Sequence, residues 1–329
     1  MQMPSRDVLI VGAGPSGLAT AIAAKHFGLD YVILEQGALV DAIARFPTNM
    51  VFFTTPELLE IGGIPLTTPY DKPTRAEALQ YYRKVVDTFQ LQLELHEEVI
   101  AIQPPDNQLG EFVVESRTSR GVTRTREARH VVLAMGYYSL PNLLNVPGED
   151  LPHVSHFYKE AHPYYRQRVV IVGGKNSAAE AALEIHRAGG HVTIVHRGPG
   201  FGESVKYWVK PDIENRVKEG SIAAHFNARV VTIRLNEVLL DTGVTLPAES
   251  VLLLTGYRAD EDFMRRIGVA ISEETHAPKY NVDTYETNVP GLFVAGGQVA
   301  GKRTGTVFIE NGRFHGQVIA KTIAARLSR

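Results

Sequence analysis

Two stretches of the chain repeat one order of apolar and polar positions. Residues 7–37 and 168–198 each contain an apolar run, a glycine-rich turn, an alanine-rich segment with helical spacing and a second apolar run. They align without a gap at an offset of 161 residues (173 − 12 = 161), so that Gly12 meets Gly173 and Glu35 meets His196. A strand, a helix and a strand within about 30 residues form a βαβ unit. The pattern therefore predicts an α/β protein with two Rossmann-like, three-layer dinucleotide-binding domains.

Strands dominate the rest of the pattern. Period-two alternation predicts strands at 92–102, 111–117 and 123–134, of which the last two form a small β-meander through a turn at Gly121. Residues 76–90 have helical spacing, and Thr74 stands where a helix N-cap belongs.

Breaks in the apolar pattern mark two crossings between the predicted domains. Pro141, Pro147 and Gly148 form the first break, and residues 255–257 end the apolar run 251–254 at the second. We therefore predict a discontinuous first domain, residues 1–142 and 254–329, with a second domain, residues 143–253, inserted into it.

Composition narrows the possible chemistry. With 329 residues the chain is long enough for two cores, and its net charge of −2 gives no electrostatic reason to expect nucleic acid or an anionic membrane. Residues 1–7 lack the regions of a signal peptide and glycines break the first apolar run, so we predict a cytoplasmic protein with no membrane segment. The chain has no cysteine. Disulfides, thiolate nucleophiles and cysteine-ligated metals are therefore excluded.

The first glycine turn has the residue types that a bound pyrophosphate requires. Gly12 permits a tight turn, Gly14 lets the backbone approach the phosphates, and Gly17 allows the helix to pack closely on the strand. Glu35 ends the second strand, where an acid accepts hydrogen bonds from the ribose hydroxyls of an adenosine. We predict that this unit binds FAD, against the alternative that the glycines serve packing alone.

The second unit ends in His196 and Arg197, where the first has Glu35 and Gln36. Exchanging an acid for basic groups replaces repulsion of a 2′-phosphate by attraction and favours NADPH over NADH; the alternative is that the pair is merely solvated. Lys206 is a further candidate phosphate ligand.

Lys175 is the discordant residue of this unit. It stands where the first unit has Gly14 (175 − 161 = 14), so the turn must differ locally. Its side chain either points outward or brings its ammonium group to the phosphate, and the sequence leaves both possibilities open.

The C-terminal region contains a turn, a buried strand and a glycine turn at residues 287–297. We predict a helix from about Thr306, directly after Gly305, whose first amides would face the pyrimidine side of a flavin; the alternative is an ordinary terminal helix. No histidine spacing indicates a metal site. We predict structural or surface roles for four histidines: His153, His156, His162 and His315.

Five longer motifs follow one another along the chain: GAGPSG at 12–17, VLAMGYYSLPN at 132–142, GGKNSA at 173–178, TGY at 255–257 and TNVPGLFVAGG at 287–297. Through them the chain resembles the low-molecular-weight thioredoxin reductases. Five further strings spread over nearly the whole sequence: FFTTPELLEIGGIP, KPTRAEALQYYR, VPGEDLP, GGKNSAAEAALE and FIENGRFHG. Within the class, the chain resembles the YpdA-type bacillithiol-disulfide reductases through these strings.

The resemblance implies FAD, NADPH as the donor, a homodimer and reduction of a low-molecular-weight thiol disulfide. Thioredoxin reductases use a CxxC pair, which this chain lacks, and YpdA-type proteins commonly carry a cysteine at the position of Ser16. Serine is neither a comparable nucleophile nor redox-active, so it forms no mixed disulfide. A second departure is the pair Gly297 and Gln298, where related flavoproteins place an aspartate that holds the flavin ribityl chain; Gln298 is the candidate substitute.

These arguments give two sets of candidate contacts and no certain catalytic residue. The predicted FAD contacts are Gly12, Gly14, Pro15, Ser16, Gly17, Glu35, Gln36, Thr48, Val99, Gly136, Gly296, Gln298 and Thr306. The predicted NADPH contacts are Gly173, Gly174, Lys175, Asn176, Ser177, His196, Arg197, Lys206 and Gly256.

We predict an FAD-dependent NADPH oxidoreductase in which a hydride passes from NADPH to flavin N5 and the electrons then pass to an unidentified acceptor. Candidate acceptors are a low-molecular-weight disulfide, ferredoxin or flavodoxin, a quinone and oxygen. The alternatives are a thioredoxin-reductase-like ferredoxin/flavodoxin-NADP⁺ reductase, a monooxygenase, whose usual insertions are not evident, and a non-catalytic FAD-binding scaffold or sensor.

Overall fold

A computed structural model of the chain describes residues 5–105 and 110–328. The chain divides into two compact units. The first unit comprises residues 1–44, 50–140 and 257–329, and the second comprises 45–49 and 141–256. The main boundaries lie close to the crossings predicted near 142 and 254. The short segment 45–49, which the sequence pattern left in the first domain, belongs to the second unit.

The first unit is built on one sheet with the strand order β3-β2-β1-β6-β5-β4, to which β17 is joined through β6. Its strands are β1 (Arg6–Val11), β2 (Tyr31–Glu35), β3 (Leu93–Leu95), β4 (Glu97–Gln103), β5 (Phe112–Thr118), β6 (Thr123–Leu133) and β17 (Leu292–Val294). The accompanying helices are α1 (Pro15–His26), α2 (Asp41–Arg45), α3 (Pro56–Leu59), α4 (Arg75–Phe89), α7 (Glu261–Arg266), η2 (Gly296–Ala300), α8 (Ile309–Gly312) and α9 (His315–Leu327).

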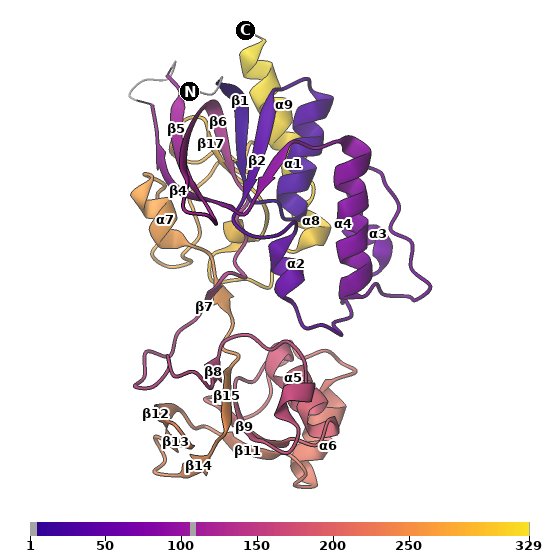
Figure 1. Cartoon of the computed structure of the whole chain (residues 1–329), viewed down its shortest axis with the longest axis vertical. Coiled ribbons are helices and arrows are strands. Elements are labelled where there is room, and N and C mark those ends of the chain that lie inside the picture. The colour runs from indigo at the N-terminus through magenta and orange to yellow at the C-terminus, as the bar shows by residue number, and fades with distance from the viewer. Residues whose placement is uncertain (1–4, 106–109, 329) are drawn as a thin grey trace. The chain divides into compact units, whose positions relative to one another are not determined.

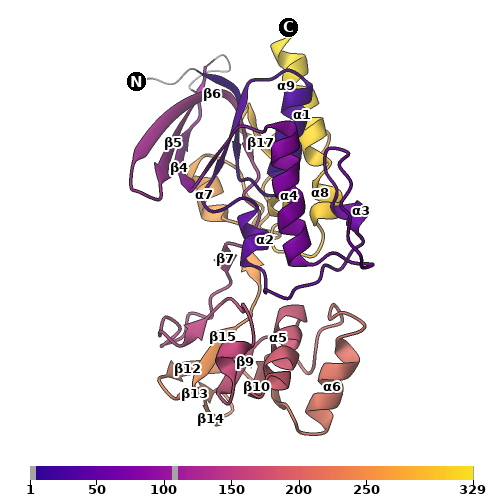
Figure 2. The same cartoon turned by 45° about the vertical axis from the view of Figure 1, so that its right-hand side comes forward.

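Strand β6 belongs to two parts of this sheet. Its first half pairs antiparallel with β5, which pairs antiparallel with β4, and this confirms the predicted meander. Its second half lies parallel to β1 from Ala128 and parallel to β17 from Val131. The parallel part is covered on one face by α1 and α9, which run side by side (Figures 1 and 2).

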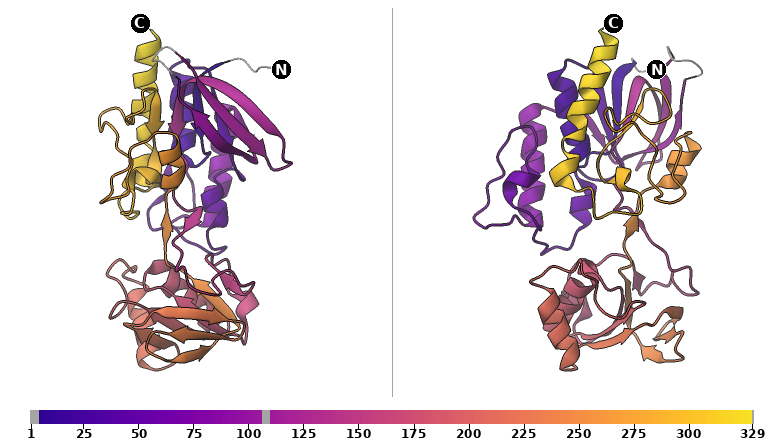
Figure 3. Two further views of the ribbon diagram at one scale, coloured as in Figure 1. Left: turned by 90° about the vertical axis from the view of Figure 1, so that its left-hand side faces the viewer. Right: turned by 180° about the vertical axis from the view of Figure 1, so that it is seen from behind.

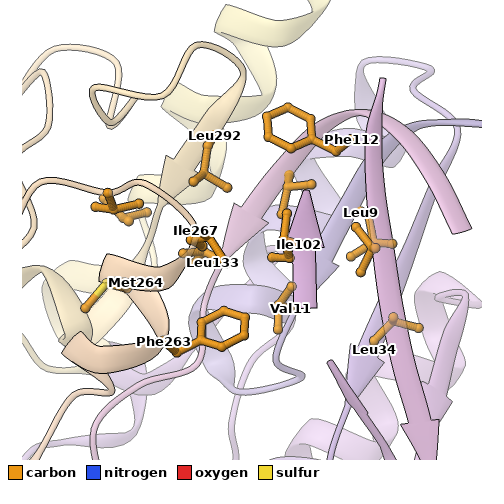
Figure 4. Close-up of a cluster of buried hydrophobic side chains, with 14 of the residues drawn as sticks. Leu9, Val11, Leu34, Ile102, Phe112, Leu133, Phe263, Met264, Ile267 and Leu292 are labelled. Carbon is orange, nitrogen blue, oxygen red and sulfur yellow. The ribbon is translucent and has the colours of Figure 1, made fainter. Parts of the chain in front are cut away.

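The core on the other face of this parallel part joins strands to a distant helix. Leu9 and Val11 of β1 pack with Phe112 of β5 and with Phe263 and Met264 of α7 (Figure 4). Because both faces of β1 are covered, its sequence is a continuous apolar run instead of an alternating one.

Helix α4 begins where the sequence predicts. The Thr74 hydroxyl accepts the Glu77 N–H at 3.3 Å, and Glu77 Oε2 accepts the Thr74 N–H at 2.7 Å, which forms a capping box. The strand predicted at 92–102 is wrong as a single element. His96 takes a φ of 57° and divides it into β3, which pairs with β2, and β4, which pairs with β5.

The second unit contains a parallel sheet, in the order β11-β10-β9-β15-β8, and a three-stranded antiparallel sheet, β12-β13-β14. Its strands are β8 (Val154–Ser155), β9 (Arg168–Val172), β10 (His191–His196), β11 (Ala223–Phe226), β12 (Val230–Arg234), β13 (Glu237–Leu240), β14 (Thr245–Pro247) and β15 (Ser250–Leu253). Its helices are η1 (His162–Tyr164), α5 (Asn176–Arg187) and α6 (Lys210–Lys218). Where the chain passes between the units, β7 (Leu140–Pro141) pairs with β16 (Tyr257–Arg258).

Alternate residues of β9 separate the two cores of the second unit. Val169 and Ile171 pack with α5 and α6, whereas Val170 and Val172 pack with the antiparallel sheet. The parallel sheet therefore lies between a helical layer and a β layer (Figures 1 and 3).

Candidate functional site

The first glycine turn is closed on one side and open on the other. Gly12 has a φ of 106°, and a Cβ there would lie 2.5 Å from the carbonyl oxygen of Ala134. A Cβ on Gly17 would lie 1.9 Å from the carbonyl oxygen of Gly12. By contrast, a Cβ on Gly14 would meet nothing within 4 Å, and Gly14 is the N-cap of α1. Open space in front of α1 amides is the geometry that a pyrophosphate needs, so these residues fit FAD.

Glu35 supports this turn from the end of β2. It is buried, and its Oε2 accepts the Ala13 N–H at 2.8 Å while Oε1 accepts the Gly37 N–H at 2.9 Å. The neighbouring Gln36 is exposed, and its Nε2 donates to Ser139 Oγ at 3.2 Å. The carboxylate therefore holds the turn in place, and its contact with a ribose stays a prediction.

The C-terminal glycine turn lies against Ser16. A Cβ on Gly296 would lie 2.6 Å from Ser16 Oγ, and one on Gly312 would lie 3.1 Å from the same oxygen. The Gly296 N–H donates to Nδ1 of His315 at 3.2 Å. Ser16 is therefore half-buried between segments that are far apart in the sequence.

His315 has a structural place behind this turn. Its ring is buried and stacks on Tyr285 with 4.2 Å between the ring centres. Burial lowers the pKa of His315 to about 4, so the ring is neutral near pH 7 and its Nδ1 stays available as an acceptor.

The predicted helix start at Thr306 is wrong. Thr306 is exposed in a turn, with its hydroxyl donating to the Arg303 carbonyl at 2.8 Å. Asn311 accepts the Phe308 N–H at 2.8 Å and donates to the Thr306 carbonyl at 2.9 Å, which moves the helix start to α8 at Ile309. Only four residues form α8, and the longer helix α9 begins at His315.

Gln298 faces the protein core. It is fully buried, its Nε2 donates to the Leu133 carbonyl, and its Oε1 has no hydrogen-bond partner among the described residues. The predicted contact of this side chain with a ribityl chain is therefore not supported. The sequence-based prediction also missed Tyr137, whose ring carbons would lie 2.7 Å from a Cβ on Gly297. Burial, and secondarily the charge of Glu310, raises the pKa of Tyr137.

Three other predicted FAD contacts lie in different surroundings. Gly136 has a φ of 67°, and a Cβ there would meet nothing within 4 Å. Val99 packs against the first-unit core at a register shift in β4. Thr48 belongs to the second unit, where its N–H donates to the Lys159 carbonyl at 2.8 Å. The contact of Thr48 with FAD stays a prediction.

The second glycine turn packs against the side chain that ends β10. Gly173 has a φ of 154°, and a Cβ there would lie 2.6 Å from the Leu254 carbonyl oxygen. A Cβ on Gly174 would lie 2.5 Å from the imidazole of His196. Lys175 is exposed, with extended backbone at the N-cap of α5. The imidazole of His196 therefore packs on Gly174, whereas its counterpart in the first unit, Glu35, accepts a hydrogen bond from Ala13.

Two of the predicted NADPH ligands hold the loop that follows β10. Asn176 Nδ2 donates to the Ser204 carbonyl at 2.8 Å, and its Oδ1 accepts the Lys206 N–H at 2.8 Å. Lys206 is buried, and its Nζ pairs with Glu180 Oε1 at 2.5 Å. Because Glu180 balances this charge, the structure does not favour the predicted phosphate contact of Lys206.

The remaining predicted NADPH ligands are accessible. Arg197, Ser177 and Gly256 are exposed, and His196 is half-buried. Burial lowers the pKa of His196, and the charges of Arg197 and Lys175 lower it further. The end of β10 therefore carries a positive potential, as a 2′-phosphate requires.

No metal or membrane feature is found in residues 5–105 and 110–328. No group of three or more acidic or histidine side chains there has a metal-binding arrangement. No helix in the same ranges is both long and apolar enough to cross a membrane. His153 and His156 instead contact the Arg234 carbonyl at 3.1 Å and Glu149 at 3.6 Å.

Two βαβ units with an acid at one strand end and basic groups at the other define a protein class with two dinucleotide sites. Residues 9–296 match the family model described as pyridine nucleotide-disulphide oxidoreductase, and the chain belongs to this family. Membership confirms the predicted oxidoreductase, with FAD and NADPH as its cofactors.

Within the family the resemblance to the YpdA type is confirmed. The chain is 42% identical to bacilliredoxin reductase Bdr of Bacillus subtilis (strain 168), over 98% of this chain and 99% of the relative. The solved bacillithiol disulfide reductase Bdr (YpdA) from Bacillus cereus is 41% identical, with a TM-score of 0.95 over 98% of this chain and 100% of that one. The thioredoxin reductase of T. acidophilum shares the fold at 20% identity, with a TM-score of 0.76 over 99% and 100% of the two chains.

Proposed function

We propose that this protein uses NADPH to reduce a low-molecular-weight disulfide of the bacillithiol kind without any thiol of its own. The overall reaction is NADPH + RSSR + H⁺ → NADP⁺ + 2 RSH, which balances in atoms and electrons. Bound FAD supplies a two-electron carrier between donor and acceptor. The observation that carries the proposal is Ser16, which stands at the family cysteine position in a chain that has no cysteine.

The contacts of Ser16 support a passive role for its side chain. Oγ lies close to Gly296 and Gly312, in a packed position at the first turn of α1. An alcohol there can donate a hydrogen bond but cannot attack a disulfide sulfur as a thiolate does. The acceptor must therefore receive its electrons without a covalent link to position 16.

The first unit offers residues to hold FAD. The amides at the start of α1, opposite the open side of Gly14, would bind the pyrophosphate, and Glu35 would fix the turn that presents them. The second unit offers His196, Arg197 and the exposed Ser177 at the start of α5 to the NADPH phosphates.

The test is NADPH oxidation with bacillithiol disulfide, ferredoxin, flavodoxin, a quinone or oxygen as the acceptor, for wild type, Ser16→Ala and Ser16→Cys. We expect wild type to reduce the disulfide and Ser16→Ala to match it within about twofold, because no covalent step uses the hydroxyl. Ser16→Cys should react at least about tenfold faster, because a thiolate restores the mixed-disulfide route.

The lack of cysteine also favours a second candidate, a ferredoxin- or flavodoxin-NADP⁺ reductase, which needs no dithiol. Turnover by wild type with ferredoxin or flavodoxin, and none with bacillithiol disulfide, would replace the first proposal by the second.

We further propose a cytoplasmic homodimer, which rests on the family resemblance. Four exposed apolar side chains near α3 and α8 support a face that a second copy of the chain covers: Phe53, Leu58, Phe308 and Phe314. Light scattering of the purified protein tests this assembly, and the mass of a monomer would contradict it.

A further inference from the structure

We propose that Lys175 binds the 2′-phosphate of NADPH together with Arg197, and so determines which pyridine nucleotide the second unit accepts. This inference rests on the proposed function, because it assigns a role within the NADPH site. It concerns a position where the first unit has Gly14, so the repeat itself shows that the lysine replaces a residue with no side chain.

The backbone brings Lys175 and Arg197 together. The imidazole of His196 lies against Gly174, since a Cβ on Gly174 would be 2.5 Å from the ring. Lys175 follows Gly174 directly and Arg197 follows His196 directly. Lys175 and Arg197 are therefore each one residue away from the contact between Gly174 and His196.

The loop after β10 lies beside the stem of the lysine. The Gly202 N–H donates to the Gly174 carbonyl at 2.8 Å, and a Cβ on Gly202 would lie 3.7 Å from Cγ of Lys175. Glycine at 202 thus leaves room beside the lysine, whose side chain is exposed.

The charge distribution supports this placement. Lys175 and Arg197 both lower the pKa of His196, so both charges act on the imidazole. A neutral imidazole adds no third charge to Lys175 and Arg197, and the two cations together match a phosphate dianion.

The end of β10 identifies the 2′-phosphate as the group that Lys175 binds. In this fold the residue at the end of the second strand faces the adenosine ribose, whereas the pyrophosphate faces the glycine turn and the helix start. Because the stem of Lys175 lies beside Gly202, in the loop that follows β10, we infer that its ammonium binds on the ribose side. In the second unit the side chain of Lys175 would thus bind a phosphate, whereas in the first unit the backbone at Gly14 would approach the pyrophosphate.

The test measures binding of 2′,5′-ADP and of 5′-AMP, which lacks the 2′-phosphate, to the full-length FAD-loaded protein by titration calorimetry. The variants are Lys175→Gln, Lys175→Gly and Arg197→Gln, with Lys218→Gln, an exposed lysine at the end of α6, as the matched control. We expect each of the first three to weaken 2′,5′-ADP about tenfold and 5′-AMP less than about twofold. The control should change neither. KM for NADPH should rise in parallel while KM for NADH stays constant.

Two outcomes overturn the inference alone: an unchanged preference for 2′,5′-ADP in both Lys175 variants, or an equal loss for both ligands, which would place the lysine on the 5′-phosphate. A wild-type protein with no preference for 2′,5′-ADP would overturn both this inference and NADPH as the donor. Unchanged flavin absorbance and melting temperature show that the variants are folded.

Discussion

The two glycine turns share one scaffold but are supported differently. In the first turn, a Cβ on Gly12 or Gly17 would clash with backbone atoms, and the carboxylate of Glu35 accepts hydrogen bonds from two backbone amides. At the second turn, the imidazole of His196 fills the space beside Gly174. In each unit the side chain that ends the second strand therefore supports its own turn. The exchange of an acid for a base at that position changes the packing of the turn as well as the charge that a ligand meets.

Gly17→Val should have the largest effect, because the new Cβ would lie 1.9 Å from the Gly12 carbonyl oxygen. We expect loss of bound FAD and destabilisation by about 4 kcal/mol, measured by flavin absorbance after gel filtration and by urea unfolding. Gly14→Ala is the control, since its Cβ meets nothing within 4 Å and should cost less than about 1 kcal/mol of stability. A stable, FAD-loaded Gly17→Val protein would refute the close packing of the first turn.

Lowering the pH should reduce the stability of the first unit through its buried histidine, His315. The unfolded chain binds a proton at His315 below pH about 6.5, whereas the folded protein does so only below about 4. Stability therefore falls as the pH drops from 6.5 to 4, by about 3 kcal/mol from this residue, and there is no such loss above pH 6.5.

Urea unfolding at several pH values measures this dependence. His315→Asn should flatten it by about 3 kcal/mol, whereas His26→Asn, an exposed residue of α1, should leave it unchanged. Equal pH dependence in His315→Asn and wild type would contradict the burial of a neutral ring.

Glu35→Ala should have a smaller effect on stability than Gly17→Val. It leaves the amides of Ala13 and Gly37 without their acceptor, and we expect a loss of about 2 kcal/mol together with weaker FAD binding. The exposed Gln36→Ala is the control and should stay within about 0.5 kcal/mol of wild type. If both variants unfold at the same urea concentration, Glu35 does not support the turn.

The sequence pattern correctly predicted those elements whose structure depends on residues within the element. The two βαβ units, the capped start of α4 and the meander depend on apolar period, on a threonine at an N-cap and on a glycine turn. Each of these signals lies within the element that it specifies, so the sequence was sufficient.

The sequence-based predictions fail where contacts between segments far apart in the sequence determine the local structure. His96 divides a predicted strand because its N–H donates to the Gly37 carbonyl and its carbonyl accepts from Ser119. Lys206 is engaged by Glu180, which is 26 residues away in the sequence. The site could be predicted in its glycines and strand ends, whereas the partners of its long side chains required the tertiary structure.

The ring of Tyr137 and any side chain at position 297 compete for one volume, since a Cβ there would lie 2.7 Å from the ring. A larger residue therefore cannot enter at position 297 while the tyrosine keeps its rotamer. A side chain at position 297 therefore needs a second change, either a smaller residue or another rotamer at position 137.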